Sequence, residues 1–186
     1  MPSTDKFISA LKSVISLFFV YLFIKIVFSM ISVEQFIQFM PAESTLIVRL
    51  TSNFSLVFST LYTGLFLVGM MFVVWFISKI CFEDLKIDTF ISALQTPLIL
   101  LVSAEILKFG FFWLFLQDEI SLLDFTSQSF IQQIEKTNYH HFCHYADVAS
   151  AFISGLFYFN ELDLKYLPKL IISSLVVASL FLIEMI

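Results

Sequence analysis

Residues 54–78 read FSLVFSTLYTGLFLVGMMFVVWFIS and contain no charged side chain. A helix needs about 20 predominantly apolar residues to cross the hydrocarbon core of a bilayer, so this stretch is long enough to span one. Three further apolar stretches cover 13–33, 97–117 and 166–186, and a shorter one covers 146–160. The pattern predicts an all-α transmembrane bundle of about five spans, forming one integral membrane domain over the whole chain.

The composition agrees with a bilayer as the main surroundings of the chain. Hydrophobic residues make up 59% of the sequence and charged residues 13%, whereas a soluble domain carries roughly 25% charged residues. The ten lysines and arginines form no basic stripe, which argues against nucleic-acid binding. No nucleophile elbow, phosphate loop or paired-carboxylate site is found. We therefore expect no enzyme activity and no cofactor.

Lysine and arginine indicate the orientation, because cytoplasmic loops hold the excess of both. With five spans, six of these residues fall on one side: Lys6, Lys12, Lys79, Lys86, Lys165 and Lys169. The other side has Arg49 and Lys136. This bias predicts a cytoplasmic N-terminus and an outer C-terminus. If 146–160 did not cross, the count would be four against four, so the charge rule favours five spans.

Short interfacial helices are expected between the spans. Mixed polar and apolar residues predict one in the outer segment 34–53, and another over 88–95 before a span that starts at Thr96 and Pro97. A plain connector over 34–53, or one long helix kinked at Pro97, is the alternative. In the outer loop 118–145, Phe130, Ile131 and Ile134 share a helical face, which predicts a third interfacial helix.

Lys25, Glu105 and Lys108 are the charges that lie well inside the expected spans. Both helices run outward from the cytoplasm, so the three residues are at similar depths, and Glu105 and Lys108 share a face at i and i+3. A lone charge at the bilayer centre costs at least about 2.5–3.5 kcal/mol, so these side chains should face inward and pair. We expect Glu105 to bridge Lys108 and Lys25.

That arrangement leaves one positive charge in excess within the spans. An anionic lipid headgroup, a carboxylate of another subunit or deprotonation of one lysine would compensate it. The cluster has three interpretations: a structural clasp between helices, a charge that docks another subunit, or an ion or proton path.

Small residues on two spans are expected to be packing faces, because they let helix backbones approach closely in lipid. In 54–78 they are Ser55, Ser59, Thr63 and Gly64, and in 146–160 they are Ser150, Ser154 and Gly155. The alternative is that the hydroxyl groups line a polar path.

All three histidines occur in one short segment with a cysteine: His140, His141, Cys143 and His144. Histidines at i and i+3 or i+4 can present two imidazoles to one metal ion, but further ligands would have to come from another segment. The alternative is a girdle of rings at the outer interface. We favour the girdle and expect no metal site.

The layout resembles that of Yip-type five-span membrane proteins. It has a cytoplasmic start, a short turn from Lys79 to Asp88 and another from Asn160 to Lys165. The tail, from Tyr145-Ala146-Asp147 through Tyr166-Leu167-Pro168-Lys169, also looks like that of small bacterial membrane proteins grouped there. The resemblance implies an accessory or scaffolding role in the bacterial cytoplasmic membrane.

The function expected from these features is that of a non-catalytic membrane subunit that docks with a larger complex in secretion, transport or assembly. Its partners would be the lipid bilayer and other integral membrane subunits. One alternative is a small transporter or channel component that uses Lys25, Glu105 and Lys108 as a path. A second is a metal or haem redox subunit.

Overall fold

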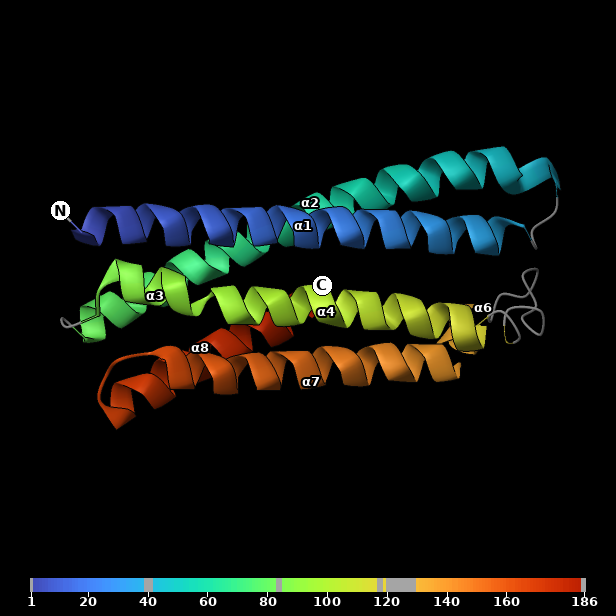
Figure 1. The fold of residues 1–186 in the computed structure, drawn as a ribbon. Helices are drawn as coiled ribbons and strands as arrows, with labels where there is room; N and C mark the ends of the chain where they lie inside the picture. Colours follow the sequence, from blue (N-terminus) through green and yellow to red (C-terminus); the bar gives the residue numbers. More distant parts are fainter. Residues whose placement is uncertain (1, 39–41, 83–84, 117–118, 120–129, 185–186) are drawn as a thin grey trace.

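The computed structural model describes residues 2–38, 42–82, 85–116, 119 and 130–184, and it is helical with no strand in those ranges. Figure 1 shows the order of the elements. They are α1 (Pro2–Ile37), α2 (Ala42–Cys81), α3 (Ile87–Ala93), α4 (Gln95–Phe111), the π-helical turn η1 (Phe112–Leu116), α6 (Phe130–Glu135), α7 (Asn138–Glu161) and α8 (Tyr166–Glu184). The expected all-α fold is confirmed.

Three segments of the described chain are long and apolar enough to cross a membrane. They are Asp5–Ile37, Thr45–Cys81 and Ile87–Phe115, and they correspond to the first three expected spans. The apolar stretch of α8, Tyr166–Leu182, is shorter. Helix α7 is less apolar than the other long helices. Length and apolarity therefore support three of the five expected spans.

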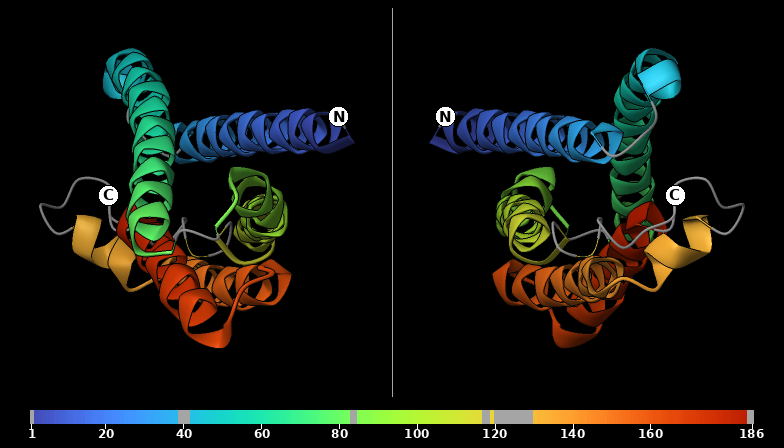
Figure 2. Two further views of the ribbon diagram at one scale, coloured as in Figure 1. Left: turned by 90° about the vertical axis from the view of Figure 1, so that its left-hand side faces the viewer. Right: turned by 90° about the vertical axis from the view of Figure 1, so that its right-hand side faces the viewer.

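The five long helices form a ring. Helix α1 packs against α2 and α4, α4 packs against α7, α7 against α8, and α8 against α2. In the views along the bundle, α4 is seen nearly end-on, whereas α1 and α2 are inclined to it (Figure 2). Each helix contributes buried side chains to one core, including Tyr21, Leu67, Leu98, Tyr158 and Val176.

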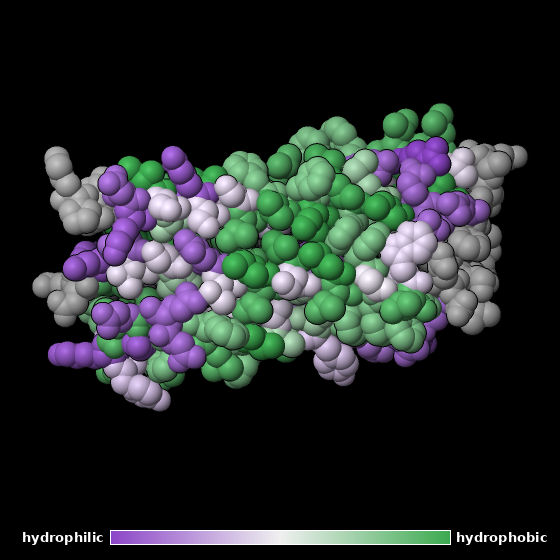
Figure 3. Space-filling view, in the orientation of Figure 1, coloured by the Kyte–Doolittle hydropathy of each residue, from purple (hydrophilic) through white to green (hydrophobic). Residues whose placement is uncertain are grey.

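Polar side chains gather at the two ends of the bundle, and apolar side chains form a belt between them (Figure 3). At one end, the Thr96 hydroxyl donates a hydrogen bond to the Glu161 carboxylate. At the other end, Arg49 pairs with Glu34 at 2.8 Å. An apolar belt between polar ends is the distribution of a protein whose middle lies in hydrocarbon. Together with the three long apolar helices, it indicates a membrane-embedded protein.

Helices occupy parts of two expected loops among the described residues. Helix α1 continues to Ile37 and α2 starts at Ala42, so the predicted interfacial helix over 34–53 is wrong. The outer loop is also shorter than predicted, because α7 starts at Asn138 and not at Ala146. The cause is a helix cap, since the Thr137 hydroxyl accepts the His140 backbone N–H at 3.1 Å. The expected interfacial segment around Phe130 is helical, as α6, while 120–129 lies outside the described residues.

The predicted start of the third span at Thr96 and Pro97 is also wrong. Helix α4 starts at Gln95, directly after a helical Leu94, and the Leu98 N–H bonds to the Leu94 carbonyl at 3.2 Å. Pro97 is tolerated in the first turn of α4 because the backbone N–H groups of that turn have no carbonyl partner within the helix, so the N–H that proline lacks is not needed. Helix α3 occupies most of the expected interfacial segment 88–95.

Candidate intramembrane charge site

The Lys108 ammonium lies between two carboxylates from different helices. Its Nζ is 2.8 Å from Glu105 Oε1, on the same helix α4, and 2.7 Å from Asp147 Oδ1, on α7. The side chains of Lys108, Glu105 and Asp147 are only 12%, 10% and 18% exposed. Both contacts are charge-assisted hydrogen bonds at these distances. The site therefore ties α4 to α7 inside the bundle.

The helical repeat explains why these groups meet. Glu105 and Lys108 are three residues apart on α4 and so share its inward face. The inward face of α7 carries residues at steps of three or four: Asp147, Ser150, Ala151, Ser154 and Tyr158. Since α4 and α7 pack against each other, this stripe brings the Asp147 carboxylate to Lys108.

Lys25 takes a different partner from the one expected. Its Nζ is 3.5 Å from the hydroxyl oxygen of Tyr21, one turn earlier on α1, and 5.8 Å from the centre of the Tyr21 ring. No ion pair joins the described side chains of Lys25 and Glu105, so the predicted bridge between them is wrong. The second ion pair of the site instead joins Lys108 to Asp147.

Asp147 also changes the charge balance. With Lys25 and Lys108 positive and Glu105 and Asp147 negative, the formal charges of these four residues sum to zero. The excess positive charge expected from the sequence is therefore compensated within the chain. An anionic lipid or a carboxylate of another subunit is no longer needed to balance it.

A cavity of about 230 Å³ adjoins Glu105 and Lys108. One wall is aromatic, where the rings of Phe28 and Phe109 stack with their centroids 3.9 Å apart. The other polar residues that line the cavity are Ser29, Ser32 and Tyr139. A water molecule has a share of about 30 Å³ in the liquid and needs two to four polar partners, so this cavity has room and partners for ordered water.

Some of the small residues expected on packing faces are buried in the structure, and others are exposed. Thr63 and Gly64 are buried, and a Cβ atom added to Gly64 would lie 3.0 Å from Leu22 of α1. Ser55 and Ser59 are exposed on the same helix. Ser150, Ser154 and Gly155 of α7 are all buried.

Gly155 of α7 packs tightly against α8 and has less free space around it than the other glycines. A Cβ atom added to it would lie 2.0 Å from Val177 Cγ2, so with a larger residue the Val177 side chain or the helix itself would have to shift.

The histidine segment forms the first turns of α7. His140, His141 and His144 are exposed and Cys143 is half-buried. Within the described residues, no three histidine, cysteine, aspartate or glutamate side chains come together as a metal site. The rings of His140 and His141 lie 6.1 Å apart.

The sequence prediction missed Asp147 as a member of the charge site. It was placed at the outer end of a span that began at Ala146, whereas α7 extends two turns further. Two signals could have found it. Asp147 lies three and seven residues before Ser150 and Ser154, on the same stripe, and the expected cluster lacked one negative charge.

Comparisons of the chain with models of protein families, with curated proteins and with solved structures found no match. The resemblance to Yip-type proteins is therefore not confirmed.

The ion pair between Lys108 and Asp147 should be strongly coupled. In a double-mutant cycle with Lys108→Met and Asp147→Asn, we expect a coupling free energy of about 2 kcal/mol, because each variant alone leaves a buried charge short of a partner. The measurement is the free energy of unfolding in mixed micelles. The control is the exposed pair Arg49 and Glu34, with a coupling of about 0.5 kcal/mol. Equal coupling in the two cycles would contradict a buried clasp.

Proposed function

We propose that the chain is a non-catalytic integral membrane subunit that crosses the bilayer five times and docks with another membrane protein. The charge site acts as its internal clasp. The observation that carries the docking proposal is the groove between α7 and α8, whose small residues would let another helix approach closely. Lys108 has its carboxylate partners, Glu105 and Asp147, within the chain. The docking contact then has to lie on the outer surface of the bundle.

Five crossings are supported by the lengths of the last two helices. Helix α7 has 24 residues and α8 has 19, which at 1.5 Å per residue correspond to about 36 Å and 28 Å. Asp147 makes α7 more polar, but its ion pair lowers the cost of placing it in the bilayer. The excess of lysines on one side supports a cytoplasmic N-terminus and an outer C-terminus.

A crossing by α7 places Lys136 and Lys165, which flank it, on opposite sides of the membrane. In a variant with Cys81 and Cys143 replaced by serine, we expect Lys136→Cys to react with a membrane-impermeant maleimide from outside. Lys165→Cys should react only after the cells are permeabilised. Labelling of both positions from the same side would refute the crossing.

The groove between α7 and α8 is the docking surface that the structure supports best. It has a volume of about 320 Å³, and its small residues are Gly155, Ser173, Ser174 and Ala178. A transmembrane helix of another protein would fill the groove, because small residues let a neighbouring helix backbone approach closely in lipid.

Filling the groove should release the partner. Ser174 and Ser103 are both exposed serines, and each hydroxyl bonds at 2.8 Å to the carbonyl four residues earlier. Ser103 is on α4, away from the groove. After purification from the native membrane in mild detergent, Ser174→Leu should lose the co-purifying membrane protein and Ser103→Leu should keep it. Recovery of a monomer without a partner from the unaltered chain would refute docking.

A transport component is the second candidate, and the polar cavity beside Glu105 and Lys108 favours it. Glu105→Gln separates the two functions. Loss of ion or proton flux with an intact complex would support transport, whereas docking through the α7–α8 groove predicts an intact complex and no loss of flux. No arrangement of histidines in the described residues favours the redox alternative.

A further inference from the structure

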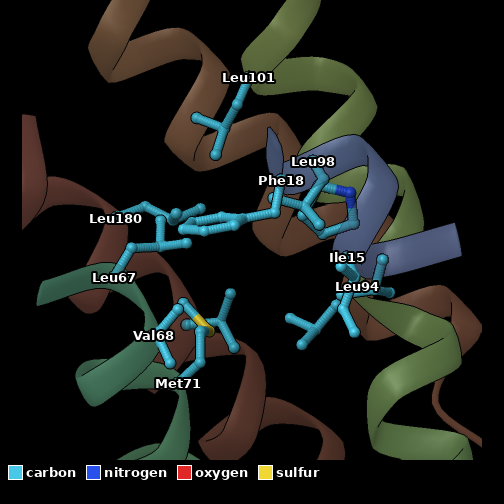
Figure 4. A pocket seen from close by; sticks show the side chains of 12 residues that line it. Ile15, Phe18, Leu67, Val68, Met71, Leu94, Leu98, Leu101 and Leu180 are labelled. Atoms are coloured by element: carbon cyan, nitrogen blue, oxygen red, sulfur yellow. The ribbon is translucent and has the colours of Figure 1, made fainter. Parts of the chain in front are cut away.

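A second cavity, of about 220 Å³, lies among α1, α2, α4 and α8 and is lined by apolar side chains alone. Figure 4 shows these side chains converging from the different helices around one space. Phe18 of α1, Met71 of α2 and Leu101 of α4 are among them. This cavity differs in character from the polar one beside Glu105, since no hydrogen-bonding side chain lines it.

The packing of α1 on α2 accounts for this space. The two helices touch closely at Gly64, where an added Cβ atom would lie 3.0 Å from Leu22 and 3.3 Å from Phe18. They cross and diverge from this contact (Figure 1). The cavity opens on the side of this contact where α1 contributes Ile15 and α2 contributes Val68.

The cavity reaches from the surface of the bundle to its core. Ile15 and Val68, on α1 and α2, are 45% and 53% exposed. At the opposite wall, Leu98, Leu101 and Leu180 are 6%, 4% and 2% exposed. Ile15 and Val68 therefore form a rim and the three leucines form a floor. The rim residues Ile15 and Val68 lie within the apolar stretches 13–33 and 54–78, so the rim faces the acyl chains of the bilayer.

We propose that this cavity binds one acyl chain of a membrane phospholipid, which enters between Ile15 and Val68. Water is a poor occupant, because it needs two to four polar partners and empty apolar cavities stay dry. An unfilled cavity forfeits the dispersion contacts of its walls. An apolar cavity of about 150 Å³ accommodates benzene, so about 220 Å³ is proportionate to roughly nine carbon atoms of a chain.

The proposal depends on membrane embedding and not on docking, so it can fail or hold independently of the proposed function. The test uses the full chain in phosphatidylcholine vesicles, in which some lipids carry a diazirine in the middle of one acyl chain. After illumination, mass spectrometry locates the labelled residues. We expect labels on the floor residues Leu98 and Leu101 as well as on exposed residues of α2. Lipids that only surround the bundle cannot reach the floor.

Val68→Trp is designed to close the rim, and Val73→Trp is the matched control. Val73 is on the same helix, is 46% exposed and does not line the cavity. Floor labelling should fall about five-fold in Val68→Trp, since the indole would fill the entrance, and should stay unchanged in Val73→Trp. Labelled exposed residues with an unlabelled floor in the unaltered chain would overturn the proposal. Equal floor labelling in the two variants would overturn the entry route.

Discussion

Lys108 lies inside the bundle with an anionic partner on its own helix and another on α7, which lowers the cost of a charge in hydrocarbon. This pairing fixes α7 against α4 in depth and in rotation. A shift of α7 by one residue would move Asp147 by about 1.5 Å along the helix axis and turn it by about 100° away from Lys108. The position of α7 in turn sets that of α8, which packs against α7 at Gly155.

The interior of the ring of helices is polar toward one end and apolar toward the other, as its two cavities show. Toward the end that carries Arg49 and Glu34, charged and hydroxyl groups meet around Lys108, and the space beside them is polar. On the other side of the close contact at Gly64, α1 and α2 separate and the space between the helices is apolar. A polar interior suits ordered water, and an apolar one suits an acyl chain. The clasp and the proposed lipid site can therefore coexist in one bundle.

The all-α class and the first three spans could be predicted from hydrophobic runs, because a long uncharged stretch has few stable alternatives to a membrane helix. The contact between Glu105 and Lys108 was also predictable from their spacing. Asp147 was missed although its stripe with Ser150 and Ser154 was visible, since its helix was expected to begin at Ala146 and the true start depends on a local hydrogen bond of Thr137. Tyr21 and Lys25 are four residues apart on α1, so their contact is compatible with the spacing. That Lys25 forms no ion pair with Glu105 depends on the packing of α1 against α4, which sequence spacing alone does not determine.

The distance between Lys108 and Asp147 in a lipid bilayer tests the central claim most directly. Solid-state NMR of the protein labelled with ¹⁵N at lysine Nζ and ¹³C at the aspartate carboxylate, compared with the Asp147→Asn variant, would report this pair. A direct contact, in keeping with the 2.7 Å separation of Nζ and Oδ1, is the predicted result. The absence of any dipolar coupling that depends on Asp147 would contradict the account, because Lys108 would then lack the carboxylate that joins α4 to α7.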